Sequence, residues 1–284
     1  MHPKIHIACF ISSHGFGHAA RASAVMNAIY DQWPYVFFEI FTETPEWFFR
    51  QSLKAPFDLH PMKTDVGLVQ TSALRFDLSE TVAALDAFLP FDDRRLDDLA
   101  DIITGKDCHL VIADISPLGI AVGKRAGIPS VLIENFTWDW IYETCRSADG
   151  RMVEHKAYLA DIFASADLHI QTDPVCCGKE ADFRAPPIAR SPSLPGDEIR
   201  RRLGIGASEK MVLITMGGIP ESFGFIDQLD RFDPDVHFVA PGAFIDLPPE
   251  GKRLNRVTLL PHASAYYHPD LVCAADAVVG KIGY

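Results

Sequence analysis

The feature that most constrains how this chain can fold is a glycine-rich turn between a strand and a helix near the N-terminus. The apolar run Ile5–Ile11 has the composition of a buried strand, and residues 19–30 carry apolar side chains at helical spacing. Gly15 and Gly17 lie between them, where they permit a tight turn and a close approach of the backbone to an anionic ligand. This strand-turn-helix unit predicts an α/β fold with a ligand site at the turn.

Strands and helices continue to alternate as far as residue 185. Strands are expected at residues 36–41, 57–62, 109–114, 130–133 and 168–171, and helices at 45–51, 78–103 with a break near Pro90, 118–126 and from 138 onward. This order predicts a Rossmann-like domain with a doubly wound parallel sheet. Ligands bind such sheets beyond the carboxyl ends of the strands. The turns at that edge are residues 12–18, 114–117, 134–135 and the turn after 171.

A proline-rich segment divides the chain. Residues 186–197 contain four prolines, which predicts a semi-rigid linker between a first domain, residues 1–185, and a second, residues 198–284. In the second domain, strands are expected at 211–216, 237–240, 257–260 and 277–279, and helices near 223–231 and at 263–274. We therefore expect a second Rossmann-like domain. It is expected to be incomplete, because the sequence ends where a further turn and helix should follow.

The charge of the chain argues against two classes of partner. Its 26 basic and 38 acidic residues give a formal net charge of −12, which repels nucleic acid and anionic lipid. The apolar run Ile5–Ile11 is too short to cross a bilayer. We therefore expect a soluble cytoplasmic protein without a membrane span and without a nucleic-acid partner.

The spacing of cysteines and histidines does not indicate a metal site. The six cysteines are scattered, and none forms a pair with metal-ligand spacing. The eleven histidines do not group with carboxylates in the patterns typical of metal ligands. We expect reduced thiols and no bound metal.

The glycine turn also fits a loose dinucleotide-binding pattern. Gly15, Gly17 and Ala20 stand at the spacing GxGxx(G/A), which would favour a nicotinamide-dependent oxidoreductase. In such enzymes the first glycine normally follows the strand directly, whereas three polar residues at 12–14 intervene here. An oxidoreductase therefore stays an alternative, and so does a turn whose glycines and histidines are only structural.

His18 and Asp114 are candidates for a proton-transfer pair. His18 lies at the opening of the helix, where the positive end of the helix dipole disfavours imidazolium and keeps the ring neutral. Asp114 ends a strand at the same edge of the sheet, so its carboxylate can reach the ring and fix its tautomer. The alternative is that Asp114 only caps the helix near Ser116 and Pro117. The spacing does not decide between these interpretations.

Four segments give the sequence a resemblance to a known family. They are His14-Gly15-Phe16-Gly17-His18-Ala19-Ala20-Arg21, Asp65-Val66-Gly67-Leu68-Val69-Gln70 with Ala73-Leu74 and Asp77, Asn135-Phe136-Thr137-Trp138-Asp139-Trp140-Ile141-Tyr142, and Gly280-Lys281-Ile282-Gly283-Tyr284. In this order they resemble the glycosyltransferase-like N-terminal region of L-arabinokinase and its stand-alone bacterial relatives. The resemblance spans nearly the whole chain. More distantly, both halves are similar to GT-B glycosyltransferases.

This resemblance implies a reaction and a set of site residues. The first domain would bind a small hydroxyl acceptor and the second a nucleotide-diphosphate sugar, with no metal and no cofactor besides that co-substrate. His18 matches the histidine that acts as base in many inverting members, and Asp114 matches the aspartate that orients it. The candidate acceptor and sugar contacts are His14, Gly15, Gly17, Arg21, Asp65, Gln70, Asn135, Trp138 and Asp139. The candidate donor contacts are Gly217, Gly218, His262, Lys281 and Gly283.

Several alternatives remain open at this point. Trp138 suits either a pyranose face or core packing, and Asp65 and Gln70 either sugar hydroxyls or their own loop. The same fold would also suit a nucleotide-sugar epimerase or hydrolase, or a sugar-nucleotide binding protein without turnover. The acidic residue that usually holds the donor ribose would lie beyond Tyr284. The resemblance does not extend to the kinase domain of L-arabinokinase, so we expect no kinase activity.

Overall fold

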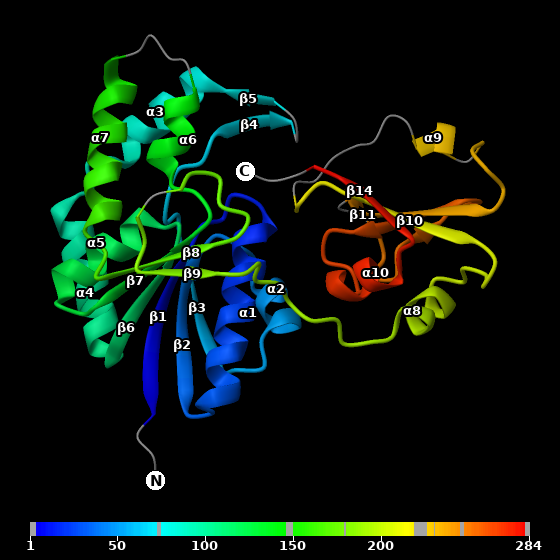
Figure 1. The fold of residues 1–284 in the computed structure, drawn as a ribbon, viewed down its shortest axis with the longest axis horizontal. Helices are drawn as coiled ribbons and strands as arrows, with labels where there is room; N and C mark the ends of the chain where they lie inside the picture. Colours follow the sequence, from blue (N-terminus) through cyan, green and yellow to red (C-terminus); the bar gives the residue numbers. More distant parts are fainter. Residues whose placement is uncertain are drawn as a thin grey trace. The chain divides into compact units, whose positions relative to one another are not determined.

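The computed structural model describes residues 4–72, 75–145, 150–178, 180–218, 226–229, 231–244 and 247–281. The chain forms two units (Figure 1). The first consists mainly of residues 1–70 and 76–189, and the second of residues 71–75 and 190–283. The division after residue 189 falls inside the proline-rich segment 186–197.

A seven-stranded parallel sheet forms the centre of the first unit, in the order β3-β2-β1-β6-β7-β8-β9. Its strands are β1 (Ile5–Ile11), β2 (Val36–Thr42), β3 (Phe57–Pro61), β6 (Cys108–Asp114), β7 (Ser130–Glu134), β8 (Leu168–Thr172) and β9 (Phe183–Ala185). Every neighbouring pair runs parallel, as the sequence predicts. The strand order reverses between β1 and β6, and doubly wound sheets bind their ligands at such a reversal.

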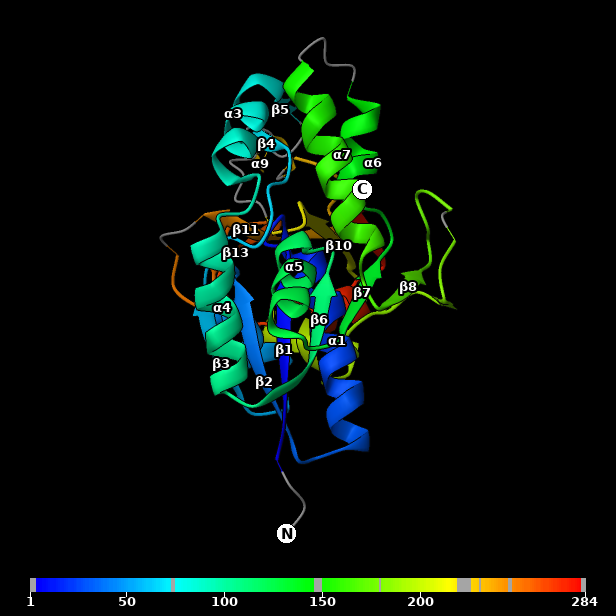
Figure 2. The same cartoon turned by 90° about the vertical axis from the view of Figure 1, so that its left-hand side faces the viewer.

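Helices cover both faces of this sheet. They are α1 (Phe16–Gln32), α2 (Glu46–Ser52), α3 (Leu78–Phe88), α4 (Asp93–Gly105), α5 (Pro117–Ala126), α6 (Trp138–Thr144) and α7 (Gly150–Ala164). Ile7 and Cys9 pack with α1 and α2, whereas Ala8 and Phe10 pack with the helices from α3 to α7. Figure 2 has α4 and α5 in front of the strands on this second face. Because alternate residues of β1 are buried on opposite faces, the strand reads as a continuous apolar run.

The second unit contains a smaller sheet in the order β12-β13-β11-β10-β14. Its strands are β10 (Lys210–Thr215), β11 (Val236–Phe244), β12 (Lys252–Arg253), β13 (Val257–Pro261) and β14 (Ala277–Gly280), and its helices α8 (Gly196–Arg202), α9 (Ile226–Leu229) and α10 (His268–Ala274). All pairings are parallel except β12 with β13. Val278 and Val279 of the edge strand β14 are 50% and 55% exposed, so the described residues leave side chains on both faces of this strand exposed.

The end of the proline-rich segment is attached to the second unit by one carboxylate. Asp270, at the start of α10, is 1% exposed. It accepts hydrogen bonds from the backbone N–H of Ser193 at 2.5 Å, from the Ser193 hydroxyl at 2.8 Å and from the N–H of Leu194 at 3.1 Å. Residues 193–194 therefore belong structurally to the second unit.

Several elements differ from the sequence prediction, and among them the short strands β9 and β12 were not predicted. Helix α8 begins at Gly196, inside the segment predicted as linker, because Ile199 and Leu203 are buried against the second sheet. The helix predicted at 263–274 begins only at His268, since the Ser264 hydroxyl bonds the backbone of Tyr266 in a turn. The hairpin of β4 (Val69–Ser72) and β5 (Arg75–Asp77) was not predicted. Of the helix predicted near 223–231, α9 is described, and residues 223–225 and 230 lie outside the described residues.

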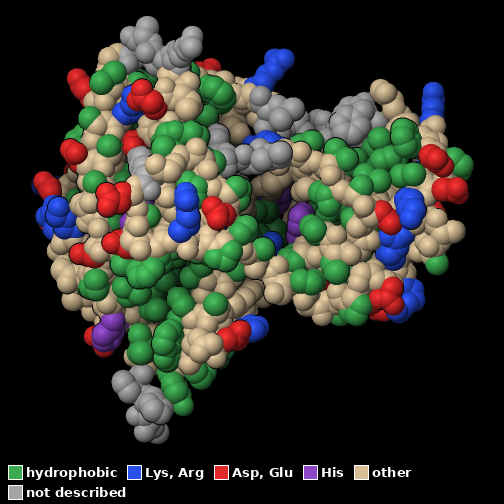
Figure 3. All heavy atoms as spheres, in the orientation of Figure 1, with side chains coloured by type: hydrophobic (Ala, Val, Ile, Leu, Met, Phe, Trp, Pro, Cys, Tyr) green, Lys and Arg blue, Asp and Glu red, His purple; other side chains and the backbone are tan. Residues whose placement is uncertain are grey.

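Acidic and basic side chains are interspersed on the face of the molecule that Figure 3 shows. Among the residues that the structure describes, none of the helices is both long enough and apolar enough to span a bilayer.

The contact between α5 and β1 leads to a test of the core beneath the site. A Cβ atom at Gly119 would lie 2.6 Å from Phe10 Cβ, and Phe10 is fully buried and stacked on Phe41. We expect Gly119→Ala to destabilise the protein by about 1–3 kcal/mol, because a tightly packed core does not accommodate an added methyl group. Urea unfolding measures the change.

Gly105, the last residue of α4, is the matched control, because a Cβ there would meet no atom within 4 Å. Gly105→Ala should change stability by less than about 1 kcal/mol. Equal effects of the two substitutions would contradict the packing argument.

Candidate active site

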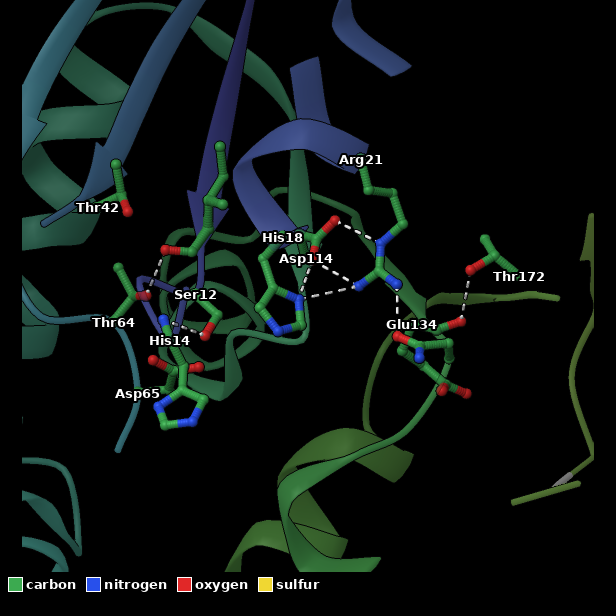
Figure 4. Close-up of polar contacts among 12 residues, drawn as sticks. Ser12, His14, His18, Arg21, Thr42, Thr64, Asp65, Asp114, Glu134 and Thr172 are labelled. Carbon is green, nitrogen blue, oxygen red and sulfur yellow. Dashed lines mark hydrogen bonds and ion pairs between the residues drawn. The ribbon is translucent and has the colours of Figure 1, made fainter. Parts of the chain in front are cut away.

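Polar side chains gather beyond the carboxyl ends of the strands in the first unit (Figure 4). Ser12 and His14 lie in the turn after β1, and His18 and Arg21 lie in the first turns of α1. Asp114 ends β6, Glu134 ends β7, and Asp65 lies in the segment after β3. The site therefore combines four segments that are distant in sequence and follow strands of the same sheet.

The start of α1 leaves its backbone donors without a side-chain cap. Gly15 is the N-cap residue with φ 83° and ψ 168°, a conformation that strongly favours glycine. Its first turn contains no acidic residue, and a Cβ at Gly17 would meet no atom within 4 Å. Backbone N–H groups without a side-chain cap, together with the helix dipole, make this end of α1 attractive to an anionic group.

The structure contains the predicted hydrogen bond between His18 and Asp114. His18 Nδ1 lies 3.1 Å from Asp114 Oδ1, and the two residues are 7% and 1% exposed. A carboxylate can only accept, so Nδ1 carries the proton in the neutral ring and Nε2 keeps a lone pair. The alternative role of Asp114 as a helix cap is wrong, because the Ser116 hydroxyl caps α5 by accepting from Gly119 N–H.

Arg21 binds the same carboxylate. Its Nε donates to Asp114 Oδ2 at 2.8 Å, and its Nη2 donates to Oδ1 at 2.6 Å. Its Nη1 donates to Asn135 Oδ1 at 2.6 Å. Burial by itself raises the pKa of Asp114, but the charge and hydrogen bonds of Arg21 and the hydrogen bond from His18 bring that pKa below its usual value. Asp114 is therefore a buried carboxylate held in its ionised form.

The backbone directly after Asp114 is in an unusual conformation. Ile115 is fully buried and has φ 46°, in the left-handed region that β-branched residues rarely occupy. Its N–H donates to the carbonyl of Ile133 at 3.2 Å. Such a conformation costs about 1–3 kcal/mol and is typical of functional sites.

A second group of contacts surrounds Asp65. Trp138 is fully buried, and its Nε1 donates to Asp65 Oδ2 at 2.7 Å. The His14 ring packs edge to face on Trp138, with 5.3 Å between centroids. A Cβ at Gly67 would lie 2.3 Å from His14 Nδ1, so the ring requires a glycine at that position. Burial raises the pKa of Asp65 to about 6, although hydrogen bonds from Ser12 and Trp138 oppose the rise.

Several residues that were predicted to contact the acceptor form hydrogen bonds with one another in the structure. Arg21 and Asn135 bond each other, and Asp65 bonds Trp138, so their polar groups hold the loops together. Asp139 is half-buried in the first turn of α6, and Gln70 is half-buried on β4 outside the main sheet. Contact of these residues with a sugar stays a prediction.

The predicted donor residues lie in the second unit. Gly217 and Gly218 follow β10 with φ values of 69° and 92°, a conformation that strongly favours glycine. Lys281 follows β14, which pairs in parallel with β10, so both segments lie at the same sheet edge. His262 follows β13, and burial lowers the pKa values of His262 and Lys281. Gly283 lies outside the described residues.

The sequence predicts that the turn 134–135 lies at this edge of the sheet, but it assigns no role to Glu134. Glu134 is 1% exposed, and its Oε1 accepts from His169 Nε2 at 2.7 Å and Gln171 Nε2 at 2.9 Å. Its position at the carboxyl end of an apolar strand is the same signal that identified Asp114. In the part of the chain that the structure describes, no three His, Cys, Asp or Glu side chains are grouped as metal ligands.

Known proteins resemble this chain in sequence and in fold. L-arabinokinase of Arabidopsis thaliana is 26% identical over 286 residues, which cover 98% of this chain and 26% of that protein, so the chain spans about a quarter of this relative's length. The spinosyn forosaminyltransferase SpnP superposes with a TM-score of 0.56 at 15% identity, covering 97% of this chain and 75% of that one. UGT89C1 of Arabidopsis thaliana, complexed with quercetin, superposes with a TM-score of 0.55 at 11% identity, covering 98% and 74%.

No protein-family model matches the chain. The similarity in sequence and the structural superpositions confirm the predicted resemblance and the GT-B glycosyltransferase-like fold.

The environment of Asp65 leads to a test of stability against pH. Its pKa is about 6 in the folded protein, against 3.8 for an ordinary aspartate, so the folded state binds the proton more tightly. Folding stability should therefore fall as pH rises from about 4 to about 6, by up to about 3 kcal/mol. Asp65→Asn keeps an acceptor for Trp138 and has no charge to bury. We expect this variant to be more stable than wild type at pH 8 and to lose that advantage at pH 4, as measured by urea unfolding.

Asp101, an exposed carboxylate on α4, provides the control. The difference between Asp101→Asn and wild type should not grow with pH. An Asp65→Asn difference that is the same at pH 4 and pH 8 would contradict the burial argument.

Proposed function

We propose that this chain is a GT-B-type glycosyltransferase that moves a sugar from a nucleotide-diphosphate donor to a hydroxyl group of a small acceptor. The observation that carries the proposal is the buried hydrogen bond between His18 and Asp114 at the start of α1. It leaves one imidazole nitrogen as a proton acceptor at the strand edge where doubly wound folds bind ligands.

The fold and the nature of its structural neighbours support this reading. SpnP is a forosaminyltransferase and UGT89C1 was crystallised with quercetin, a small molecule with hydroxyl groups. An acceptor of this general class would suit a proton-accepting imidazole. The kinase activity of L-arabinokinase is not part of the proposal, because the chain matches a quarter of that protein.

In the proposed reaction, the acceptor hydroxyl places its proton on His18 Nε2. The acceptor oxygen then forms a bond to the anomeric carbon as the bond from that carbon to the diphosphate oxygen breaks. The diphosphate leaves with the bonding electron pair, and the proton stays on the imidazole. Asp114 stabilises the imidazolium that forms, because its carboxylate accepts the Nδ1–H.

The second unit would hold the leaving diphosphate. The positive φ values of Gly217 and Gly218 suit a turn that presents backbone N–H groups to phosphate oxygens. Lys281, at the same sheet edge, would add a positive charge. In this scheme, backbone amides and one lysine stabilise the leaving group without a metal ion.

A panel of nucleotide-diphosphate sugars, each incubated with and without a mixture of small hydroxyl compounds, tests the reaction class. Release of nucleotide diphosphate that requires an acceptor supports a transferase. Release without an acceptor indicates a hydrolase, and a changed sugar on an intact nucleotide indicates an epimerase. Calorimetric binding without any conversion indicates a sugar-nucleotide binding protein.

Substitution of the proposed base is the sharpest test of the mechanism. We expect His18→Ala to lower kcat by roughly 10²–10⁴-fold while donor affinity stays nearly unchanged, because general-base catalysis acts in the transition state. Asp114→Asn should lose less, and the double variant little more than His18→Ala, since the two residues act as a unit. Steady-state kinetics and calorimetry measure the two quantities.

His109 is a suitable control because it lies at the opposite end of β6 from Asp114 and is exposed. His109→Ala should keep wild-type turnover. Full activity of His18→Ala would overturn the assignment and make His14 the next candidate base.

A further inference from the structure

The positively charged side chain of Arg21 lies beside the proposed catalytic pair of His18 and Asp114. Arg21 Nη2 is 3.3 Å from His18 Nδ1 and 2.6 Å from Asp114 Oδ1, so imidazole, carboxylate and guanidinium meet in one cluster. The side chains of Arg21 and Asp114 are 10% and 1% exposed. A pair of His and Asp alone would carry one negative charge with the ring neutral, whereas this cluster carries none.

The contacts of Arg21 argue against a direct role in binding a sugar. All three guanidinium nitrogens donate to protein groups: Nε and Nη2 to Asp114, and Nη1 to Asn135. Figure 4 shows the Arg21 guanidinium facing the Asp114 carboxylate, with dashed lines to both carboxylate oxygens. The fork geometry fixes the carboxylate in two directions at once, which a lysine ammonium does not do.

Arg21 also brings a positive charge next to the His18 ring. A positive charge next to an imidazole opposes the uptake of a proton, and a carboxylate that is already paired attracts the imidazolium less. The other titratable groups around His18 are Asp65 from the segment after β3 and His14 from the same turn. Glu134 at the end of β7 interacts with Arg21 itself.

We propose that Arg21 is a positioning residue that fixes the Asp114 carboxylate and whose positive charge opposes the uptake of a proton by the His18 ring. This inference rests on the proposed function, in which His18 is the base. In this inference Arg21 acts on His18 and Asp114 and does not bind the sugar acceptor. The family resemblance, in contrast, groups Arg21 with the acceptor contacts.

Two substitutions separate the charge of Arg21 from its geometry. Arg21→Gln removes the cation, so the His18 ring should take up its proton at a higher pH than in wild type. Its kcat at pH 7 should fall several-fold and recover at higher pH, with KM little changed. Arg21→Lys keeps the cation, so the pH dependence should stay near that of wild type. Its kcat should still fall by about tenfold at every pH, because the carboxylate is no longer held by a fork.

Nuclear magnetic resonance of the protein labelled with ¹⁵N-histidine measures the tautomer and the protonation of His18 without any need for turnover. In wild type, the neutral ring should carry its proton on Nδ1. In Arg21→Gln, the ring should take up its second proton at a higher pH than in wild type. Arg125→Gln is the matched control, since Arg125 forms its ion pairs with Asp93 and Asp97 on α4 and not with His18 or Asp114. It should leave both the His18 titration and kcat unchanged.

The outcomes distinguish failure of this inference from failure of the proposed function. If His18 titrates at the same pH in Arg21→Gln as in wild type, the inference is overturned, whatever the activity. If Arg21→Gln raises KM and leaves the pH profile of kcat in place, Arg21 binds substrate and the inference is also overturned. If the His18 titration moves as expected but the wild-type protein converts no nucleotide-sugar, the inference on Arg21 holds and the proposed transferase function is wrong. Arg21→Lys keeps the test valid should Arg21→Gln not fold.

Discussion

The parallel pairing of β1 with β6 is the constraint on which the rest of the first unit depends. In this register Ile11 lies opposite Asp114, and the N–H of Ser12 donates to the Asp114 carbonyl at 3.2 Å. The turn after β1 and the end of β6 therefore emerge side by side. Because the strand order reverses here, the helices that follow the two strands cover opposite faces and leave the edge between them open.

Burial of charge at this edge explains the pattern of contacts around it. An isolated carboxylate is costly to bury, and the structure deals with Asp114 and Asp65 in different ways. Asp114 is paired with a guanidinium and an imidazole, and its pKa is lowered. Asp65 has neutral donors, from Trp138 and Ser12, and its pKa rises to about 6. Two carboxylates in one site thus differ in their pKa values, and such a difference lets neighbouring acids take separate roles.

The sequence predicted most of the first unit because its strands are apolar on both faces and are separated by clear turns. The errors lie where local composition and packing disagree. Pro195 and Gly196 read as linker, yet buried Ile199 makes the following residues a helix. Residues 263–267 have helical composition, yet the Ser264 side chain forms a turn there. The short hairpin of β4 and β5 has too few residues to give a period of two.

The sequence by itself determined the strand-turn-helix unit, the alternation of elements, and the presence of His18 and Asp114 at one sheet edge. These follow from periodicity and from the rule that parallel strands end together. Only the tertiary structure decided that Arg21 turns toward Asp114, that Trp138 bonds Asp65, and that the His14 ring packs on Gly67. Arg21 lies 93 residues from its partner Asp114, and Trp138 lies 73 residues from its partner Asp65. Their meeting depends on strand register and on the direction of each side chain, and neither is encoded in local spacing.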